Sequence, residues 1–303
     1  MSQPTSKAPS HWQIGLVLMI GILAASTAAI LIRLAIAAAA IQGVGFSLVL
    51  AASRLTIASI VLLPTWRSIQ RRPPAIAAYQ AAAAAGLALA IHFATWITSL
   101  SYTSIAASTT LVTTNPIWVA LFSWIWWREL PSRLTLAGIA IALSGGILIS
   151  LGSESSTVIS SQPWLGNGLA LMGAWAASAY FLFGREAQRQ GMGIGGYATV
   201  AYTVAAIVLL PLPLLMGTSY RGYPTLTYGY MVLMALLPQL VGHTSFNWAV
   251  RWVSPTLVTL VILFEPVISS ILGYWLFREV PGVTVLAGAG VMLLGVALAA
   301  VNR

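Results

Sequence analysis

Long apolar runs separated by short polar connections fill almost the whole chain. Each run has about 20 residues, the length that an α-helix needs to cross the hydrocarbon core of a bilayer. The connections are too short to hold further domains. This pattern predicts an all-α integral membrane protein with ten transmembrane helices. The expected spans are 13–33, 45–64, 76–99, 104–127, 133–151, 164–185, 194–216, 226–249, 254–277 and 283–301.

Composition supports the same fold class. Of the 303 residues, 59% are hydrophobic and only 6% are charged, too few charges to cover the surface of a soluble domain. The net charge of +9 would favour a nucleic-acid partner in a soluble protein. Here the basic residues lie between the spans, so we expect the lipid bilayer as partner and no nucleic acid. The first run is too long for a signal-peptide core, and we expect it to remain as a helix.

Cysteine is absent from the chain. This excludes disulfides, thiolate metal sites and iron–sulfur clusters. No motif for a cofactor or a metal ion occurs, so none is expected.

The second half of the chain repeats the first. Arg128-Glu129-Leu130-Pro131 aligns with Arg278-Glu279-Val280-Pro281, and Gly138 and Gly145 align with Gly288 and Gly295, all 150 positions apart. We expect a cytoplasmic tail (1–12), a first five-helix repeat (13–151), a non-cytoplasmic linker (152–163) and a second five-helix repeat (164–303). The paired glycines are expected to let neighbouring helices approach closely.

An odd number of spans per repeat means that the two copies cross the membrane in opposite directions. Basic residues support this topology, because most of them fall on the side that carries both termini, which predicts cytoplasmic termini. That side carries Lys7, Arg67, Arg71, Arg72, Arg128, Arg133, Arg185, Arg189, Arg251 and Arg303, and the other carries Arg33, Arg221 and Arg278.

Glu265-Pro266 lies near the middle of the ninth span, and Asn115-Pro116 occupies the matching place in the fourth. A carboxyl group beside a helix-breaking proline is tolerated at membrane depth only where protein or a water-filled cavity surrounds it. Inverted repeats with such positions at mid-membrane are typical of secondary transporters.

With these features, the sequence resembles the drug/metabolite transporter superfamily with two EamA-type repeats. Within that superfamily it is similar to the YddG-type exporters of aromatic amino acids. The resemblance implies a basket of helices around a central cavity, the fifth and tenth spans outside it, alternating access, and export across a bacterial inner membrane. Arg54 in the second span departs from the repeat, since Ala201 takes its place in the second half.

Polar residues inside the spans are the candidate site. Gln239, His243 and Asn247 share one face of an α-helical eighth span, as do His92, Trp96 and Ser99 in the third. Such stripes either line a cavity or hold helices together by hydrogen bonds. We favour a cavity that binds a polar, partly aromatic solute, although for either histidine alone the two interpretations are balanced.

Glu265 has three candidate roles: a proton carrier, an acceptor for donors on neighbouring spans, or a partner for the ammonium group of a solute. Its counterpart Asn115 cannot titrate, which weighs against proton coupling. Trp175 and Ser178 are expected to share one face of the sixth span and to contact the solute, with packing or lipid contact as the alternative for the indole. Arg54 binds a substrate carboxylate or serves the structure, and we favour structure.

Together these features predict a secondary transporter that exports small amphipathic metabolites, most of all amino acids with aromatic or hydrophobic side chains. A drug or cation efflux carrier is the alternative, because Glu265 and several tryptophans can hold a cation. An enzyme is disfavoured, since no metal-binding, nucleophile-elbow or Walker-type motif occurs. We expect a monomer, with a dimer as the alternative.

Overall fold

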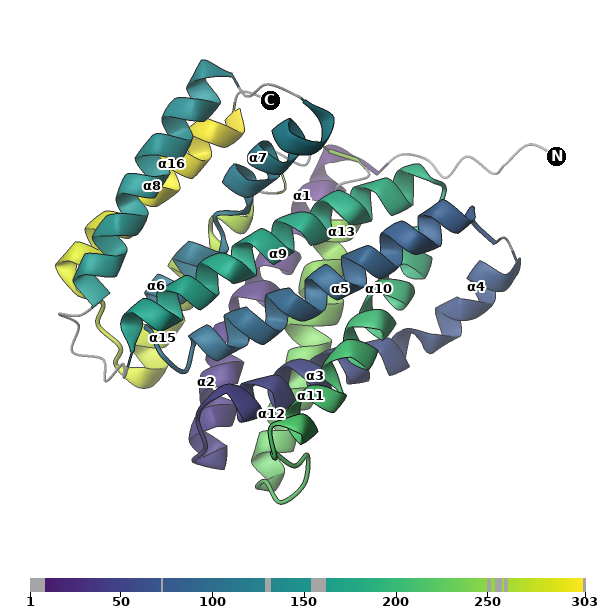
Figure 1. Ribbon diagram of the computed structural model, residues 1–303, viewed down its shortest axis with the longest axis horizontal. Helices are drawn as coiled ribbons and strands as arrows, with labels where there is room; N and C mark the ends of the chain where they lie inside the picture. The colour runs from purple at the N-terminus through teal and green to yellow at the C-terminus, as the bar shows by residue number, and fades with distance from the viewer. Residues whose placement is uncertain are drawn as a thin grey trace.

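The computed structural model describes residues 9–71, 73–128, 132–153, 162–249, 252–253, 258 and 261–301, and these residues form helices and turns but no strand (Figure 1). The first half contains α1 (His11–Ser26), α2 (Ala28–Ala39), α3 (Val44–Leu62), η1 (Leu63–Thr65), α4 (Trp66–Arg71), α5 (Ile76–Ser99), α6 (Ile105–Val112), α7 (Asn115–Trp127) and α8 (Arg133–Ser153). The second half contains α9 (Pro163–Arg189), α10 (Ile194–Leu209), α11 (Pro211–Leu215), α12 (Thr225–Met234), η2 (Ala235–His243), α13 (Thr244–Ala249), α15 (Glu265–Phe277) and α16 (Val283–Val301).

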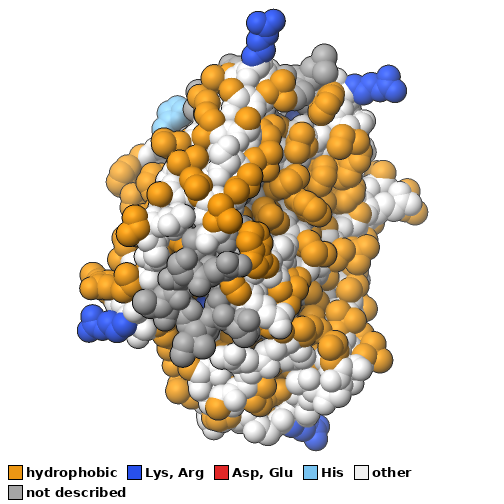
Figure 2. All heavy atoms as spheres, turned by 60° about the vertical axis from the view of Figure 1, so that its left-hand side comes forward, with side chains coloured by type: hydrophobic (Ala, Val, Ile, Leu, Met, Phe, Trp, Pro, Cys, Tyr) orange, Lys and Arg blue, Asp and Glu red, His pale blue; other side chains and the backbone are white. Residues whose placement is uncertain are grey.

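The helices have the length and composition expected of membrane spans. Within the described residues, 6 helical segments are long and apolar enough to cross a bilayer, and α8 and α16 contain shorter apolar stretches. Figure 2 shows a broad apolar surface, with the visible Lys and Arg side chains projecting from its periphery. The all-helical membrane fold is therefore confirmed. The expected ten spans are shown in part, because α9 is not among these six helices, α8 and α16 contain only the shorter stretches, and part of the ninth span, 254–277, lies outside the described residues.

Two expected spans are broken at matching positions of the repeats. The fourth is not one helix: α6 ends at Val112 and α7 begins at Asn115, with Pro116 in its first turn. In the ninth, α15 begins at Glu265, with Pro266 in its first turn. Proline lacks the N–H that would continue a helix and its ring clashes with the preceding turn. Each repeat therefore starts a half-helix at the centre of the bundle.

The eighth span differs from a regular α-helix. Its middle section, η2, is a π-helix that contains Pro238 and ends at His243. A π-helix bonds residue i to i+5, and proline removes a bond from the regular ladder. The i, i+4, i+8 alignment expected for Gln239, His243 and Asn247 assumed an unbroken α-helix, and that assumption is wrong.

The two halves pack in the same pattern. The first span of one half contacts the third span of the other, so that α1 lies on η2 and α13, as α9 lies on α5. Counterparts also contact each other directly, α3 with α10 and α8 with α16, and the fourth span meets the ninth where α6 contacts α15. The caps of α7 and α15 agree as well, since Arg128 and Arg278 both have φ of 56°. The rest of the first Arg-Glu-x-Pro segment, 129–131, lies outside the described residues.

Helices α8 and α16 form a pair on one flank of the bundle (Figure 1), as the resemblance implied for the fifth and tenth spans. A Cβ added to Gly288 would lie 2.7 Å from the backbone nitrogen of Ile149 and 2.8 Å from the carbonyl oxygen of Gly145. Gly295 meets the backbone of Ala142 and Gly138 in the same way. The expectation that these glycines permit close helix contact is confirmed.

An ion pair ties the first span to the second half. Arg33 Nη1 lies 3.8 Å from Glu279 Oε2, and Arg33 Nη2 donates to the carbonyl oxygen of Thr103 at 2.5 Å. Glu279 also accepts from the backbone N–H of Ile105 at 2.6 Å. One carboxylate thus joins α2 to the start of α6 at one end of the bundle.

Candidate functional site

A cavity lies between the halves, with about 530 Å³ of empty space including the part that is open to the outside. It is lined by the first, third and fourth spans and by their counterparts, the sixth, eighth and ninth. Its walls are therefore built from matching elements of the two repeats. The lining residues are Ala25, Ala28, Leu89, His92, Trp96, Val112, Thr113, Asn115, Ala177, Tyr180, Phe181, His243, Phe246, Ile262 and Glu265.

His92 of α5 is fixed by a bond to the neighbouring helix. Its Nδ1 lies 2.9 Å from the carbonyl oxygen of Gly173 in α9. A carbonyl only accepts, so Nδ1 carries the hydrogen, and in a neutral imidazole Nε2 then presents a lone pair. His92 therefore offers an acceptor to a molecule in the cavity.

Glu265 supplies the charged group of the cavity lining. It is half-buried at the first position of α15, and no hydrogen bond or ion pair joins it to another described residue. Asn115 is 6% exposed and bonds differently. With its amide nitrogen turned toward the backbone, it donates to the carbonyl oxygens of Val112 at 3.0 Å and Ala174 at 3.2 Å. At matching positions of the two repeats, the amide of Asn115 is therefore hydrogen-bonded, whereas the carboxyl group of Glu265 is unpaired.

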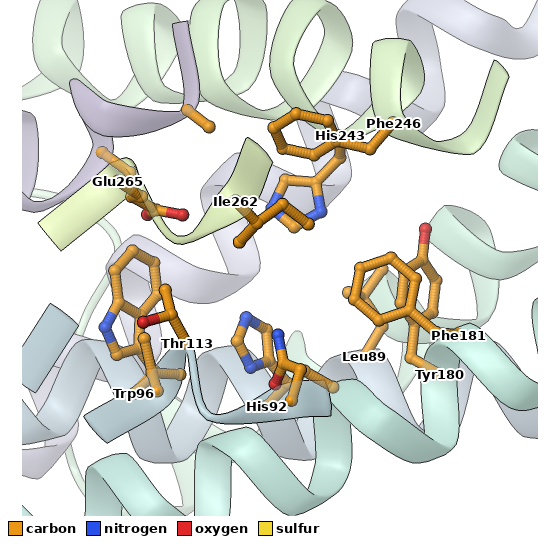
Figure 3. Close-up of a pocket in the computed structure, with 15 residues that line it drawn as sticks. Leu89, His92, Trp96, Thr113, Tyr180, Phe181, His243, Phe246, Ile262 and Glu265 are labelled. Atoms are coloured by element: carbon orange, nitrogen blue, oxygen red, sulfur yellow. The ribbon is translucent and has the colours of Figure 1, made fainter. Parts of the chain in front are cut away.

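Aromatic rings form much of the remaining wall. Trp96 stacks on His92, with centroids 5.8 Å apart and an interplanar angle of 11°, and its buried indole N–H has no partner in the described structure. His243 faces His92 across the cavity with centroids 6.5 Å apart, as Figure 3 shows. Tyr180 and Phe246 extend the aromatic surface. Such a wall suits a solute that has an apolar or aromatic part.

Five of the nine predicted site residues meet at the cavity: His92, Trp96, Asn115, His243 and Glu265.

The other four lie elsewhere. Gln239 accepts from Arg54 Nε at 2.8 Å, and Asn247 donates to the Tyr180 hydroxyl at 2.8 Å. Ser178 is 0% exposed and donates to the carbonyl oxygens of Asn115 and Ala174. All three residues bond to neighbouring helices. For Gln239 and Asn247 this is the alternative considered for the polar stripe, whereas Ser178 was expected to contact the solute.

Trp175 lies on the outer surface. It is 44% exposed and packs against Trp118 with centroids 5.1 Å apart. Three helix positions differ by only about 60° around the axis, so Trp175 and Ser178 lie on neighbouring parts of one face of α9, as expected. Their surroundings differ, because the indole extends to the outer surface while Ser178 is buried, and neither residue lines the cavity.

Sequence reasoning missed Tyr180, Phe181, Phe246 and Thr113 in the lining. The aromatic residues looked like ordinary apolar positions within their spans. Tyr180 and Phe246 each lie within two positions of a residue that we singled out, so proximity to a polar stripe was the available signal. Thr113 could be recognised as a lining residue only once the break between α6 and α7 was known. Its hydroxyl donates to the carbonyl oxygen of Thr109 in α6.

Comparison with known protein families agrees with a two-repeat structure around a cavity. The model of the EamA-like transporter family matches residues 13–151 and 164–301, nearly the whole chain. The chain belongs to the EamA-like transporter family. It is therefore a multi-pass membrane protein of a family of transporters rather than of enzymes.

The individual proteins that match this chain are only distantly related to it. A protein of Streptantibioticus cattleyicolor named "Probable terminal-alkyne amino-acid exporter" is 24% identical over 196 residues, which is 64% of this chain and 62% of that protein. The "Uncharacterized inner membrane transporter YedA" of Escherichia coli K12 is 27% identical over 197 residues, 64% of this chain and 61% of its own length. The matched region thus spans about three fifths of these relatives.

A solved crystal structure supports the fold of this EamA-like protein. It superposes with a TM-score of 0.61 at 18% sequence identity, covering 96% of this chain and 97% of that chain.

Proposed function

We propose that this EamA-like transporter exports amino acids with aromatic or hydrophobic side chains by alternating access. The observation that carries the proposal is the unpaired carboxyl group of Glu265 in a cavity that is otherwise aromatic and uncharged. As a carboxylate, Glu265 accepts from the ammonium group of an amino acid, and His92 Nε2 provides a second acceptor. The rings of Trp96, Tyr180 and Phe246 then contact the side chain of the solute.

The placement of the cavity supports a transport cycle. Matching elements of inverted repeats surround it, and half-helices begin beside it at Asn115 and Glu265. Transporters of this kind move one repeat against the other around such a site. The name of the Streptantibioticus relative is consistent with an amino-acid solute.

A carrier of lipophilic cations is the second candidate. It is favoured by the same carboxyl group together with Trp96, because an aromatic face and a carboxylate attract any cation. The acceptor at His92 Nε2 distinguishes the two candidate solutes. The ammonium group of an amino acid can donate an N–H to it, whereas a quaternary ammonium group has none to donate.

For the cellular setting, we propose a bacterial inner membrane with both termini cytoplasmic, from the distribution of basic residues and the kind of membrane named for the Escherichia coli relative. We propose a monomer as the working unit, because the two repeats of one chain already supply matching walls for the cavity.

Counterflow in liposomes tests the function. Purified protein is reconstituted, the vesicles are loaded with each of the twenty amino acids in turn, and entry of the same labelled amino acid is followed. Saturable counterflow is expected for phenylalanine, tryptophan and leucine, with the solute recovered chemically unchanged. Counterflow of lipophilic cations alone would overturn the amino-acid proposal, and conversion of the solute would indicate an enzyme.

A further inference from the structure

A second group of polar side chains lies behind the cavity wall, around Arg54 of α3. The Arg54 side chain is 0% exposed, its Nε donates to Gln239 Oε1 at 2.8 Å, and its Cζ lies 4.1 Å from the centroid of the Phe93 ring. Neither terminal nitrogen, Nη1 or Nη2, has a hydrogen-bond partner in the described structure. No ion pair joins this guanidinium to a described carboxylate.

Three neighbouring groups are buried without a hydrogen bond of good geometry: Gln239 Nε2, the hydroxyl of Tyr202 in α10 and the hydroxyl of Thr244 in α13. The Tyr202 hydroxyl interacts weakly with the side chains of Gln239, Thr244 and Tyr180 and lies within electrostatic range of Arg54. Hydrogen-bond donors from Gln239, Tyr202 and Thr244 therefore surround the positively charged guanidinium of Arg54.

A buried charge without a counter-ion is costly, and native proteins compensate it with acids, carbonyl groups or bound ions. Arg33 of this same chain shows the usual solution, since it bonds to Thr103 and pairs with Glu279. Arg54 interacts with the carboxyl group of Glu265 only at a distance longer than an ion pair, and its single hydrogen bond is the one from Nε. A purely structural role would leave its two terminal nitrogens unexplained.

We infer that Arg54, Gln239, Tyr202 and Thr244 form a binding site for a small monovalent anionic group. Two sources share this chemistry: the carboxylate of the transported amino acid, and free chloride. The first source rests on the proposed function, and the second does not. Guanidinium, amide and hydroxyl donors suit either group.

The position of the site links it to the cavity. The Phe93 ring contacts Arg54 on one side, and its centroid lies 5.5 Å from that of His243, which lines the cavity. Gln239 and His243 belong to the same π-helix, η2. A movement of Phe93 together with η2 would open Arg54 to the cavity, so that the carboxylate of a zwitterion binds here while Glu265 holds its ammonium group.

Two variants test the site without removing Arg54, whose loss is liable to prevent folding. Tyr202→Phe removes a hydroxyl that makes no hydrogen bond of good geometry, and Gln239→Glu places a carboxylate beside the guanidinium. Tyr220→Phe is the matched control, because it removes a tyrosine hydroxyl in the loop before α12. Each protein is purified in detergent, and ligand binding and thermal unfolding are measured in chloride and in gluconate.

If the solute supplies the carboxylate, Tyr202→Phe binds L-phenylalanine about tenfold more weakly, whereas phenethylamine, which lacks the carboxylate, binds as before. If chloride is the ligand, exchange for gluconate lowers the melting temperature of the native protein but not of Gln239→Glu. The inference is overturned if both variants retain the native affinity for L-phenylalanine and the native response to chloride. A chloride effect that Gln239→Glu abolishes, in a protein that binds no amino acid, would refute the proposed function and keep the anion site.

Discussion

At the scale of single residues, the polar side chains in and around the cavity are of two kinds: some already form hydrogen bonds within the protein, and others remain open, with no hydrogen-bond partner in the described structure. Asn115 and Ser178 donate to backbone carbonyls, and Asn247 donates to Tyr180. Glu265 and the indole N–H of Trp96 have no such partner in the described structure. The open groups are those that a solute can bind, so variants at these positions should change binding more than stability.

Replacing Glu265 with glutamine should weaken amino-acid binding about tenfold to a hundredfold, because a bond to a charged acceptor is worth about 1.5 to 3 kcal/mol. Titration calorimetry with the best amino acid from the counterflow screen measures the change. Glu186→Gln is the control, since Glu186 lies near the end of α9 and bonds to Gln190. Native affinity in Glu265→Gln would remove the carboxylate from the site. Full uptake with native pH dependence in this variant would also exclude Glu265 as a proton carrier.

The two indoles Trp96 and Trp118 should respond in opposite ways to replacement by phenylalanine. Trp96→Phe shortens a ring that lines the cavity and removes an N–H that has no partner in the described structure, so it should lower solute affinity with little loss of stability. Trp118→Phe breaks a 2.9 Å bond to the Thr114 hydroxyl outside the cavity and should cost about 1 kcal/mol of stability with affinity unchanged. Thermal unfolding and ligand titration on both variants separate the two effects. Loss of affinity in Trp118→Phe alone would place the solute elsewhere.

At the scale of helices, the bundle combines rigid contacts with irregular segments. The α8–α16 pair is held together by glycine-mediated backbone contact, whereas the spans around the cavity are interrupted at Asn115, at Glu265 and in η2. Irregular backbone at membrane depth is tolerated where it lines a cavity inside protein. We therefore expect the flanking pair to anchor the bundle while the interrupted helices move.

Alanine substitution at two glycines of α16 should have opposite effects on stability. Gly288→Ala should destabilise the protein by about 1 to 3 kcal/mol, because its Cβ would overlap the backbone of α8. Gly290→Ala should stabilise it by about 0.5 to 1 kcal/mol, because its Cβ meets no atom within 4 Å and alanine favours helices. Thermal unfolding in detergent measures both. Equal shifts would mean that α8 and α16 do not pack closely.

Apolar runs predicted the spans, and charged, proline and glycine residues that recur 150 positions apart predicted the repeat and the close approach of helices at the paired glycines, because each depends on local composition or fixed spacing. That α8 and α16 are the helices that meet there required the structure. The π-helix was not predicted, because Pro238 indicates a break in the regular hydrogen-bond ladder but not which irregular winding replaces it. The cavity was predicted in part. His92, Trp96 and His243 stand out as polar or aromatic groups within spans, whereas Tyr180 and Phe246 look like packing residues until the helices are placed.

At the scale of the whole molecule, the Arg33–Glu279 pair joins the two repeats at one end of the bundle. Alternating access requires that such contacts break when the cavity opens toward that end. The side chains are 22% and 5% exposed, so the pair is only partly screened by solvent. It should bias the protein toward the state that is closed at this end.

Arg33→Ala should therefore expose the cavity toward that end, shifting the equilibrium by about 1 to 2 kcal/mol, a factor of about 5 to 30. The chain has no cysteine, so a single Ala177→Cys substitution in the cavity lining reports access to an impermeant thiol reagent. Labelling from that side should become faster in Arg33→Ala. Arg221→Ala, an exposed arginine predicted on the same side, is the control. Unchanged labelling would show that the pair does not control access.

The π-helical section also acts as a register. A shift by one residue rotates the chain that follows a helical segment by about 100°. Deleting one residue between Ala235 and His243, with the winding of the rest of η2 unchanged, would turn α13 about its axis, separating Asn247 from Tyr180 and carrying Phe246 away from the cavity. Length, as much as side-chain identity, is therefore constrained in this stretch, and single-residue deletions there should abolish transport while similar deletions in the loop before α12 are tolerated.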